Sequence, residues 1–324
     1  MTQTASPAPP QDLLPFAGPE GTGRASAGIK IAAEALGPLG KLPGTWTGTG
    51  FSALWRPRFD NPLQKQHFLQ LNFTQETFTV NSIGGEVPNR GLVQDDIFLT
   101  GVRYLQQVHD GSGFVPPVGG GALHIEPGFF LLVPKTAEPE GPQSVVRLGS
   151  VPHGNALLAT GQSFETPGPP PIAAASITPF RVVDPPAAPG DRQLVPFPES
   201  TLTNPPGIQR SDPLPTGVTQ ALVDDPNTLL TDRIADQQAA GATITHTTTL
   251  VVSTRTKPAG IENIPFLAPN ADAVDLDAIF WIEKVQPATG PAFLQLQYTQ
   301  TLMLNFNGLS WPHVSVANLL LTGA

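Results

Sequence analysis

The sequence predicts an all-β protein, folded as an antiparallel sandwich or barrel. Segments in which apolar and polar residues alternate recur at short intervals along the chain, as in sheets with one buried face. The 324 residues include 38 Pro and 32 Gly, which favour strands and turns over helices. Hardly any helical periodicity separates the alternating segments, so βαβ units are not expected.

The composition limits the classes of function. Apolar residues make up 40% of the chain, enough for a sizeable core. The net charge of -9, without a run of Lys or Arg, argues against nucleic-acid and membrane partners. The absence of Cys excludes a disulfide scaffold and a Cys-ligated metal. No signal-peptide pattern or apolar run of about 18 residues occurs, so we expect a soluble, cytoplasmic protein.

The chain is expected to begin with a flexible arm at 1–40, rich in Pro, Ala, Ser and Gly, with a short helix at 29–36. The first strand is predicted at 44–51, where Thr alternates with Trp46 and Gly. Glycines inside a strand indicate that another backbone or a ligand comes close. Trp46 is expected to plug one end of the fold, since a large ring can fill such a space.

Ten further strands are expected from period-two alternation or from short apolar runs bounded by turn residues. They lie at 67–80, 96–109, 121–134, 145–151, 155–164, 172–183, 243–256, 277–285, 293–306 and 314–321.

The alternation fails between residues 184 and 241. This stretch contains several Pro-rich clusters and one good helix candidate, at 227–240. A structureless loop of that length is improbable in a compact domain. We therefore expect a single domain at 41–324, interrupted by an ordered insertion at 184–241 that lies against the sheet or across its mouth.

Common catalytic motifs are missing. The six histidines form no HxH, HxxxH or HExxH pair, so a multi-His metal site would depend entirely on the fold. The chain also lacks GxSxG, a GxGxxG that opens a helix, and GxxxxGK[ST]. Serine hydrolases, dinucleotide enzymes and P-loop NTPases therefore lose support.

Several segments, in their order along the chain, resemble the nitrobindin-like family of heme-binding β-barrels, which is related in shape to lipocalins and fatty-acid-binding proteins. The resemblance implies an up-and-down barrel of about ten strands. It rests on Gly44-Thr-Trp-Thr-Gly-Thr-Gly50, on LHIEPGFFLLVP at 123–134, on VVRLGSVPHGNALLATG at 145–161, on FLQLQYTQTLMLNF at 293–306 and on WPHVSVANL at 311–319.

The resemblance covers about 41–164 and 243–321. It implies a noncovalent heme b whose ferric iron is held by His313, with chemistry on nitric oxide and isomerisation of peroxynitrite to nitrate. Lys257 lies in a segment similar to a family strand with a heme-contacting Lys. Two features depart from the family: residues 51–54 replace its Tyr-Pro-Thr-Ile, and the last strand lacks the doubled His and the closing Arg.

Three histidines are candidate site residues, each with a structural alternative. His313 either ligates iron or is a hydrogen-bonded residue at a strand end. His124 and Glu126 lie two apart, hence on one face, and form either a proton-transfer pair or a polar support between strands. His153, in a Pro-His-Gly turn at the rim, gates the pocket, lies distal to the iron or is a solvated turn residue.

Other functions remain open at this point. A peroxynitrite isomerase-like enzyme is one reading, and a heme-free, lipocalin-like carrier of a small apolar ligand is the alternative. In both, a small molecule occupies the barrel lumen. A third reading makes the barrel a scaffold whose insertion binds a protein, and a homodimer is left open.

Overall fold

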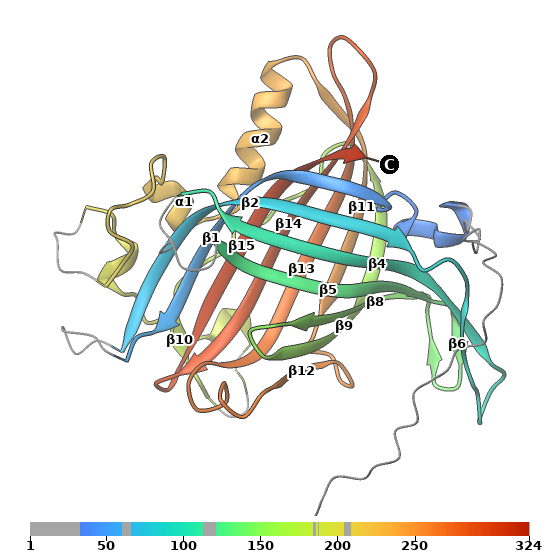
Figure 1. Ribbon diagram of the computed structural model, residues 1–324, viewed down its shortest axis with the longest axis horizontal. Helices are drawn as coiled ribbons and strands as arrows, with labels where there is room; N and C mark the ends of the chain where they lie inside the picture. The colour runs from blue at the N-terminus through green and yellow to red at the C-terminus, as the bar shows by residue number, and fades with distance from the viewer. Residues whose placement is uncertain are drawn as a thin grey trace, which may run out of the picture.

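The chain folds into a closed antiparallel barrel of ten strands, as predicted (Figure 1). The computed structural model describes residues 33–59, 66–112, 121–183, 186, 188–203 and 209–323. Neighbouring strands pair in chain order, and the last closes the barrel on the first. They are β1 (Gly44–Pro57), β2 (His67–Ser82), β4 (Ile97–Asp110), β5 (Ala122–Val133), β8 (Ser144–Val151), β9 (Asn155–Pro167), β11 (Thr243–Ser253), β13 (Asp272–Gln286), β14 (Phe293–Phe306) and β15 (Leu309–Gly323).

Short elements complete the structure. The short strands are β3 (Val87–Asn89), β6 (Thr136–Ala137), β7 (Glu140–Gly141), β10 (Phe180–Arg181) and β12 (Gly260–Asn263). Sequence analysis missed β12, which pairs with β9. The helices are η1 (Ala33–Leu39), η2 (Pro189–Asp191), η3 (Pro198–Ser200), α1 (Gln220–Asp224) and α2 (Thr228–Ala239). No helix in the described part of the chain is both long and apolar enough for a membrane span.

The seam between the first and last strands is tight. β1 and β15 pair along most of their length, from Thr45 opposite Gly323 to Leu54 opposite His313. A Cβ at Gly48 would lie 2.0 Å from the carbonyl oxygen of Asn318. The predicted close approach at the glycines of β1 is therefore an approach of backbone to backbone.

One half of the interior is filled by apolar side chains. Trp46 is fully buried, and its Nε1 donates to the carbonyl oxygen of Leu42 at 2.8 Å. Leu36 and Leu39 of η1 pack in the same cluster. Residues 33–40 therefore plug this end of the barrel, because their leucines are buried inside it. The predicted flexible arm does not extend over these residues. Residues 1–32 lie outside the described part.

The described residues of the excursion between β9 and β11 (168–242) pack on the outside of the barrel. Trp55 Nε1 donates to the carbonyl oxygen of Ile177 at 2.8 Å, and the backbone N–H of Leu69 donates to the carbonyl oxygen of Gln209 at 2.8 Å. The predicted strand at 172–183 is wrong except for β10, because most of this segment contacts the barrel through side chains rather than a ladder. The predicted helix at 227–240 is α2.

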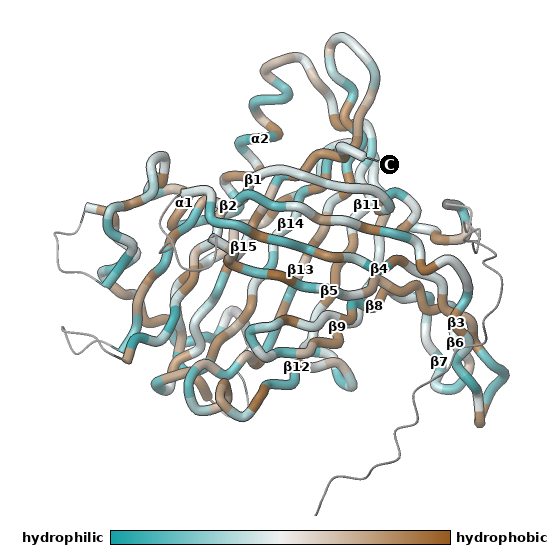
Figure 2. Tube along the Cα trace, in the orientation of Figure 1, coloured by the Kyte–Doolittle hydropathy of each residue, from teal (hydrophilic) through white to brown (hydrophobic). Residues whose placement is uncertain are grey.

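Hydropathy follows this arrangement. Hydrophobic and hydrophilic residues alternate along much of the barrel (Figure 2). Where the excursion covers the outside, both faces of a strand are apolar, as in β13, whose Phe280 and Ile282 face the inner core and whose Trp281 faces the outer cluster. The second half of the lumen, beyond the apolar filling, holds the candidate site.

Candidate functional site

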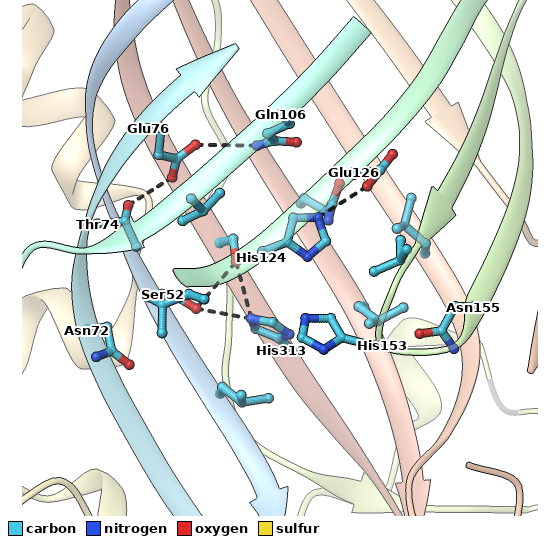
Figure 3. A pocket seen from close by; sticks show the side chains of 18 of the residues that line it. Ser52, Asn72, Thr74, Glu76, Gln106, His124, Glu126, His153, Asn155 and His313 are labelled. Atoms are coloured by element: carbon cyan, nitrogen blue, oxygen red, sulfur yellow. Dashed lines mark hydrogen bonds and ion pairs between the residues drawn. The ribbon is translucent and has the colours of Figure 1, made fainter. Parts of the chain in front are cut away.

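A cavity of about 180 Å³ occupies the half of the lumen opposite the plug (Figure 3). It lies toward the ends where β1 joins β2 and β8 joins β9. More than half of the lining side chains are polar. The polar ones belong to Ser52, Gln70, Asn72, Thr74, Glu76, Gln106, His124, Glu126, His153, Asn155, Tyr298, Gln300, His313 and Ser315, and the apolar ones to Leu54, Val108, Leu123, Val151, Leu157, Ile261, Leu276 and Leu302.

His313 faces this cavity from the last strand. Ser52 of β1 lies directly opposite Ser315 of β15, and His313 is two residues from Ser315 on the same face. The Nε2 atom of His313 lies 3.0 Å from the Ser52 hydroxyl and 3.2 Å from the Ser315 hydroxyl. Each hydroxyl can donate or accept, so the pair can accommodate either tautomer of the ring.

The imidazole of His313 is neutral over the physiological range. Burial, followed by the charges of His124 and His153, lowers its pKa from 6.5 to about 3. A neutral imidazole offers one hydrogen-bond donor and one acceptor, or a lone pair for a metal.

His124 and His153 line the same cavity (Figure 3). Their ring centroids are 5.7 Å apart. His153 lies in the turn between β8 and β9, and burial and the charge of His124 lower its pKa. Lys257 does not join them: it lies on an exposed turn between β11 and β12 and is not among the lining residues.

His124 and Glu126 share a face of β5, as expected from their spacing. The Nε2 atom of His124 lies 3.4 Å from Glu126 Oε2. Glu126 in turn accepts two hydrogen bonds from Arg147 Nη2, at 2.8 and 3.0 Å, and one from the hydroxyl of Tyr104. Gly149 makes room for this carboxylate, since a Cβ there would lie 2.5 Å from Glu126 Oε1.

The Glu126–Arg147 pair is charged and fully enclosed. Burial raises the pKa of Glu126, but the charge of Arg147, with hydrogen bonds from His124 and Tyr104, lowers it to about 2 overall. Sequence analysis did not single out Arg147. The pattern that could have pointed to Arg147 is its position in the strand: a charged residue lies on the same inward face as Val145 and Gly149, where an apolar residue is expected.

A second carboxylate lies in the cavity wall. Glu76 of β2 is 4% exposed and accepts hydrogen bonds from Tyr298 at 2.6 Å, from Thr74 at 2.8 Å and from Gln106 at 3.3 Å. Burial raises its pKa, and these hydrogen bonds offset part of that effect. Glu76 was not predicted as a site residue, because Tyr298 is 222 residues away from it and only the closed fold brings the two together.

The arrangement suits recognition by hydrogen bonding. Its walls present imidazoles, hydroxyls and amides beside apolar side chains. Within the described ranges, no group of three or more His, Cys, Asp or Glu side chains could hold a metal ion by itself. An iron carried by an organic cofactor, which needs only one protein ligand, would be compatible with His313 alone.

Comparisons with known proteins add no relative. No family model, no curated protein and no solved structure matches this chain. The likeness to lipocalins and fatty-acid-binding proteins is therefore one of shape alone: a closed antiparallel barrel with a cavity inside it.

Proposed function

We propose that this chain is a binding protein that takes a small organic molecule into the open half of its barrel. The observation that carries the proposal is the cavity itself: the same strands that are packed solid around Trp46 leave a hollow of about 180 Å³ around His313. A cavity of about 150 Å³ in another protein binds benzene. The ligand is thus about the size of one ring with short substituents.

The walls indicate an amphiphilic ligand rather than a purely apolar one. Leu54, Val108 and Leu302 provide apolar contact, whereas His313 and the hydroxyls beside it provide donors and acceptors. Pockets of this kind bind the body of a ligand by apolar contact and orient it by a few polar groups.

Native mass spectrometry of the protein as isolated tests the proposal, together with Leu54→Trp, which fills the cavity. The wild-type protein should carry an organic adduct that Leu54→Trp loses. Leu320→Trp is the matched control, because Leu320 lies on β15 with its side chain exposed. An adduct that persists in Leu54→Trp, or a wild-type protein that carries none, would contradict binding in the lumen.

Heme b on His313 is a second candidate. One observation favours it: a neutral imidazole faces the lumen from the last strand, where the resemblance to nitrobindin-like proteins expects the iron ligand. When bound, such a heme would offer ferric iron to nitric oxide or peroxynitrite and support isomerase-like chemistry.

The other lining residues do not fit a porphyrin as they stand. The cavity is smaller than the roughly 300–1,000 Å³ typical of pockets for drug-sized ligands. Within the described part of the chain, no Lys or Arg lines it to pair with the two propionates. Heme binding would therefore require a wider cavity.

Titration with hemin distinguishes the two candidates. Heme binding predicts a Soret band that His313→Ala abolishes and that His109→Ala, an exposed control on β4, retains. A spectrum equal to that of free hemin, or one unchanged in His313→Ala, would eliminate His313 as an iron ligand.

A further inference from the structure

The lumen contains two buried carboxylates, and they differ in their charge compensation. The chain has two tyrosines, and each donates its hydroxyl to one of these carboxylates: Tyr104 to Glu126 and Tyr298 to Glu76. Beyond this shared feature, Glu126 has a guanidinium at 2.8 Å, from Arg147. Its charge is neutralised inside the protein.

Glu76 has three hydrogen-bond donors and no cation in direct contact among the described residues. Its donors are a phenol, a hydroxyl and an amide, from Tyr298, Thr74 and Gln106. None of the described lining residues is Lys or Arg. His124 acts on Glu76 only through its charge, because its Nε2 is directed at Glu126.

A buried carboxylate without a counter-charge is costly, and the cost is relieved when a cation binds it. Glu76 lines the cavity, so a molecule in the lumen can reach it. Building on the proposed function, we propose that the lumen selects ligands that carry a basic amine, with the ammonium group bound at Glu76.

The rest of the cavity agrees with this ligand class. An ammonium group donates hydrogen bonds and accepts none, and the oxygens of Glu76 are acceptors when ionised. Apolar side chains such as Val108 and Leu276 provide contact for a ring. Ligands with a carboxylate are disfavoured, because Glu76 and Glu126 would repel them and Arg147 is already engaged on Glu126.

Binding of an amine also has a proton signature. Burial raises the pKa of Glu76, and an ammonium beside it favours the ionised form. Amine binding therefore shifts Glu76 toward the ionised form, and any protonated fraction releases its proton. The titratable and charged groups that act on the Glu76–Tyr298 pair are His124 and Arg147, and burial raises the pKa of Tyr298 far above the working range.

Three probes of one shape test the inference by isothermal titration calorimetry: benzylamine, benzyl alcohol and benzoate. The wild-type protein should bind benzylamine at least about tenfold more tightly than benzyl alcohol, and benzoate most weakly. In Glu76→Gln the affinity for benzylamine should fall to that for benzyl alcohol, whose own affinity should stay the same. Glu262→Gln makes the same change of net charge on an exposed part of β12 and should keep the amine preference.

The protonation readout gives an independent check. In two buffers with different ionisation enthalpies, benzylamine binding should release more protons from the wild-type protein than from Glu76→Gln as the pH is lowered toward the range in which Glu76 titrates. Equal affinities for benzylamine and benzyl alcohol, or an amine preference that survives Glu76→Gln, would overturn amine recognition and leave the carrier function standing. If no probe binds, amine recognition fails as well, and native mass spectrometry of the isolated protein decides the carrier function separately.

Discussion

The two halves of the barrel interior are built by the same strands and differ in the side chains that those strands direct inward. Toward the plug, the inward positions of β1 and β5 hold Trp46 and Phe130, both almost fully buried in the core. Toward the mouth, the same strands present Ser52 and His124. Because the pleat fixes which residues face inward, side-chain size and polarity alone decide whether a section of lumen is filled or hollow.

The Glu126–Arg147 pair marks the boundary between the two halves. The guanidinium of Arg147 lies over the rings of Tyr104, Phe130 and Phe280, at 5.4 to 5.9 Å from their centroids. On its other side, Glu126 lines the cavity. The comparison predicts that substitutions in the plugged half affect stability, whereas substitutions in the hollow half affect binding.

Trp46→Ala should have the largest effect on stability. Removing a fully buried indole, together with its hydrogen bond to Leu42, should lower the free energy of unfolding by about 3–5 kcal/mol. Urea denaturation followed by circular dichroism measures this loss. Leu54→Ala on the same strand should cost much less, because Leu54 borders the cavity and is only half-buried. Equal losses of stability in the two variants would show that the plugged and hollow halves do not differ in their contribution to stability.

Arg147→Met should be the next most damaging. It leaves Glu126 buried without its cation, which we expect to cost about 3 kcal/mol at pH 7. Adding Glu126→Gln should restore most of the loss, since the second change removes the uncompensated charge. The free energies of unfolding of the two single variants and the double variant form a cycle that measures the coupling. Additive effects would show that the pair does not act as a unit.

Acid should remove the contribution of the same pair in the wild-type protein. The pKa of Glu126 is about 2 in the fold, below its ordinary value of 4.5, so the folded state gains stability from the ionised form. That gain is complete above about pH 5 and is lost as the pH falls toward 2, by about 3 kcal/mol at about 1.4 kcal/mol per pKa unit.

The measurement compares the pH dependence of urea midpoints in the wild-type protein and in the double variant Arg147→Met with Glu126→Gln. The stability difference between the two proteins should shrink from pH 5 to pH 3. A constant difference over this range would mean that Glu126 does not carry the acid sensitivity.

The barrel itself was predictable, because alternation and apolar runs depend on neighbouring residues within one strand. The strands at 67–80 and 293–306 follow directly from that pattern. The path of residues 168–179 was not predictable, because its apolar residues satisfy side-chain contacts on the outer wall and have no period of their own. The short strand β12 was missed for a related reason, since it is defined by its pairing with β9.

The candidate site divides in the same way. His124 and Glu126 could be placed together from their spacing, since residues two apart share a face of a strand. The partners of Arg147 and Glu76 could not be predicted in this way, because they come from other strands and depend on the register of the whole barrel. The position of His313 in the lumen was expected from a resemblance; Lys257, expected on the same ground, lies on an exposed turn outside the cavity.

His313→Gln should have the smallest effect on stability and a large one on binding. The hydroxyls of Ser52 and Ser315 lie 3.4 Å apart and can bond each other or the new amide, so no buried group is left unpaired. We expect the free energy of unfolding to change by less than about 1 kcal/mol. Affinity for the co-purified ligand should fall, because the donor–acceptor pair of the imidazole is lost from the cavity wall. A loss of stability comparable to that of Trp46→Ala, with affinity unchanged, would mean that His313 is a structural residue, because removing a side chain needed for packing lowers the free energy of unfolding whether or not a ligand binds.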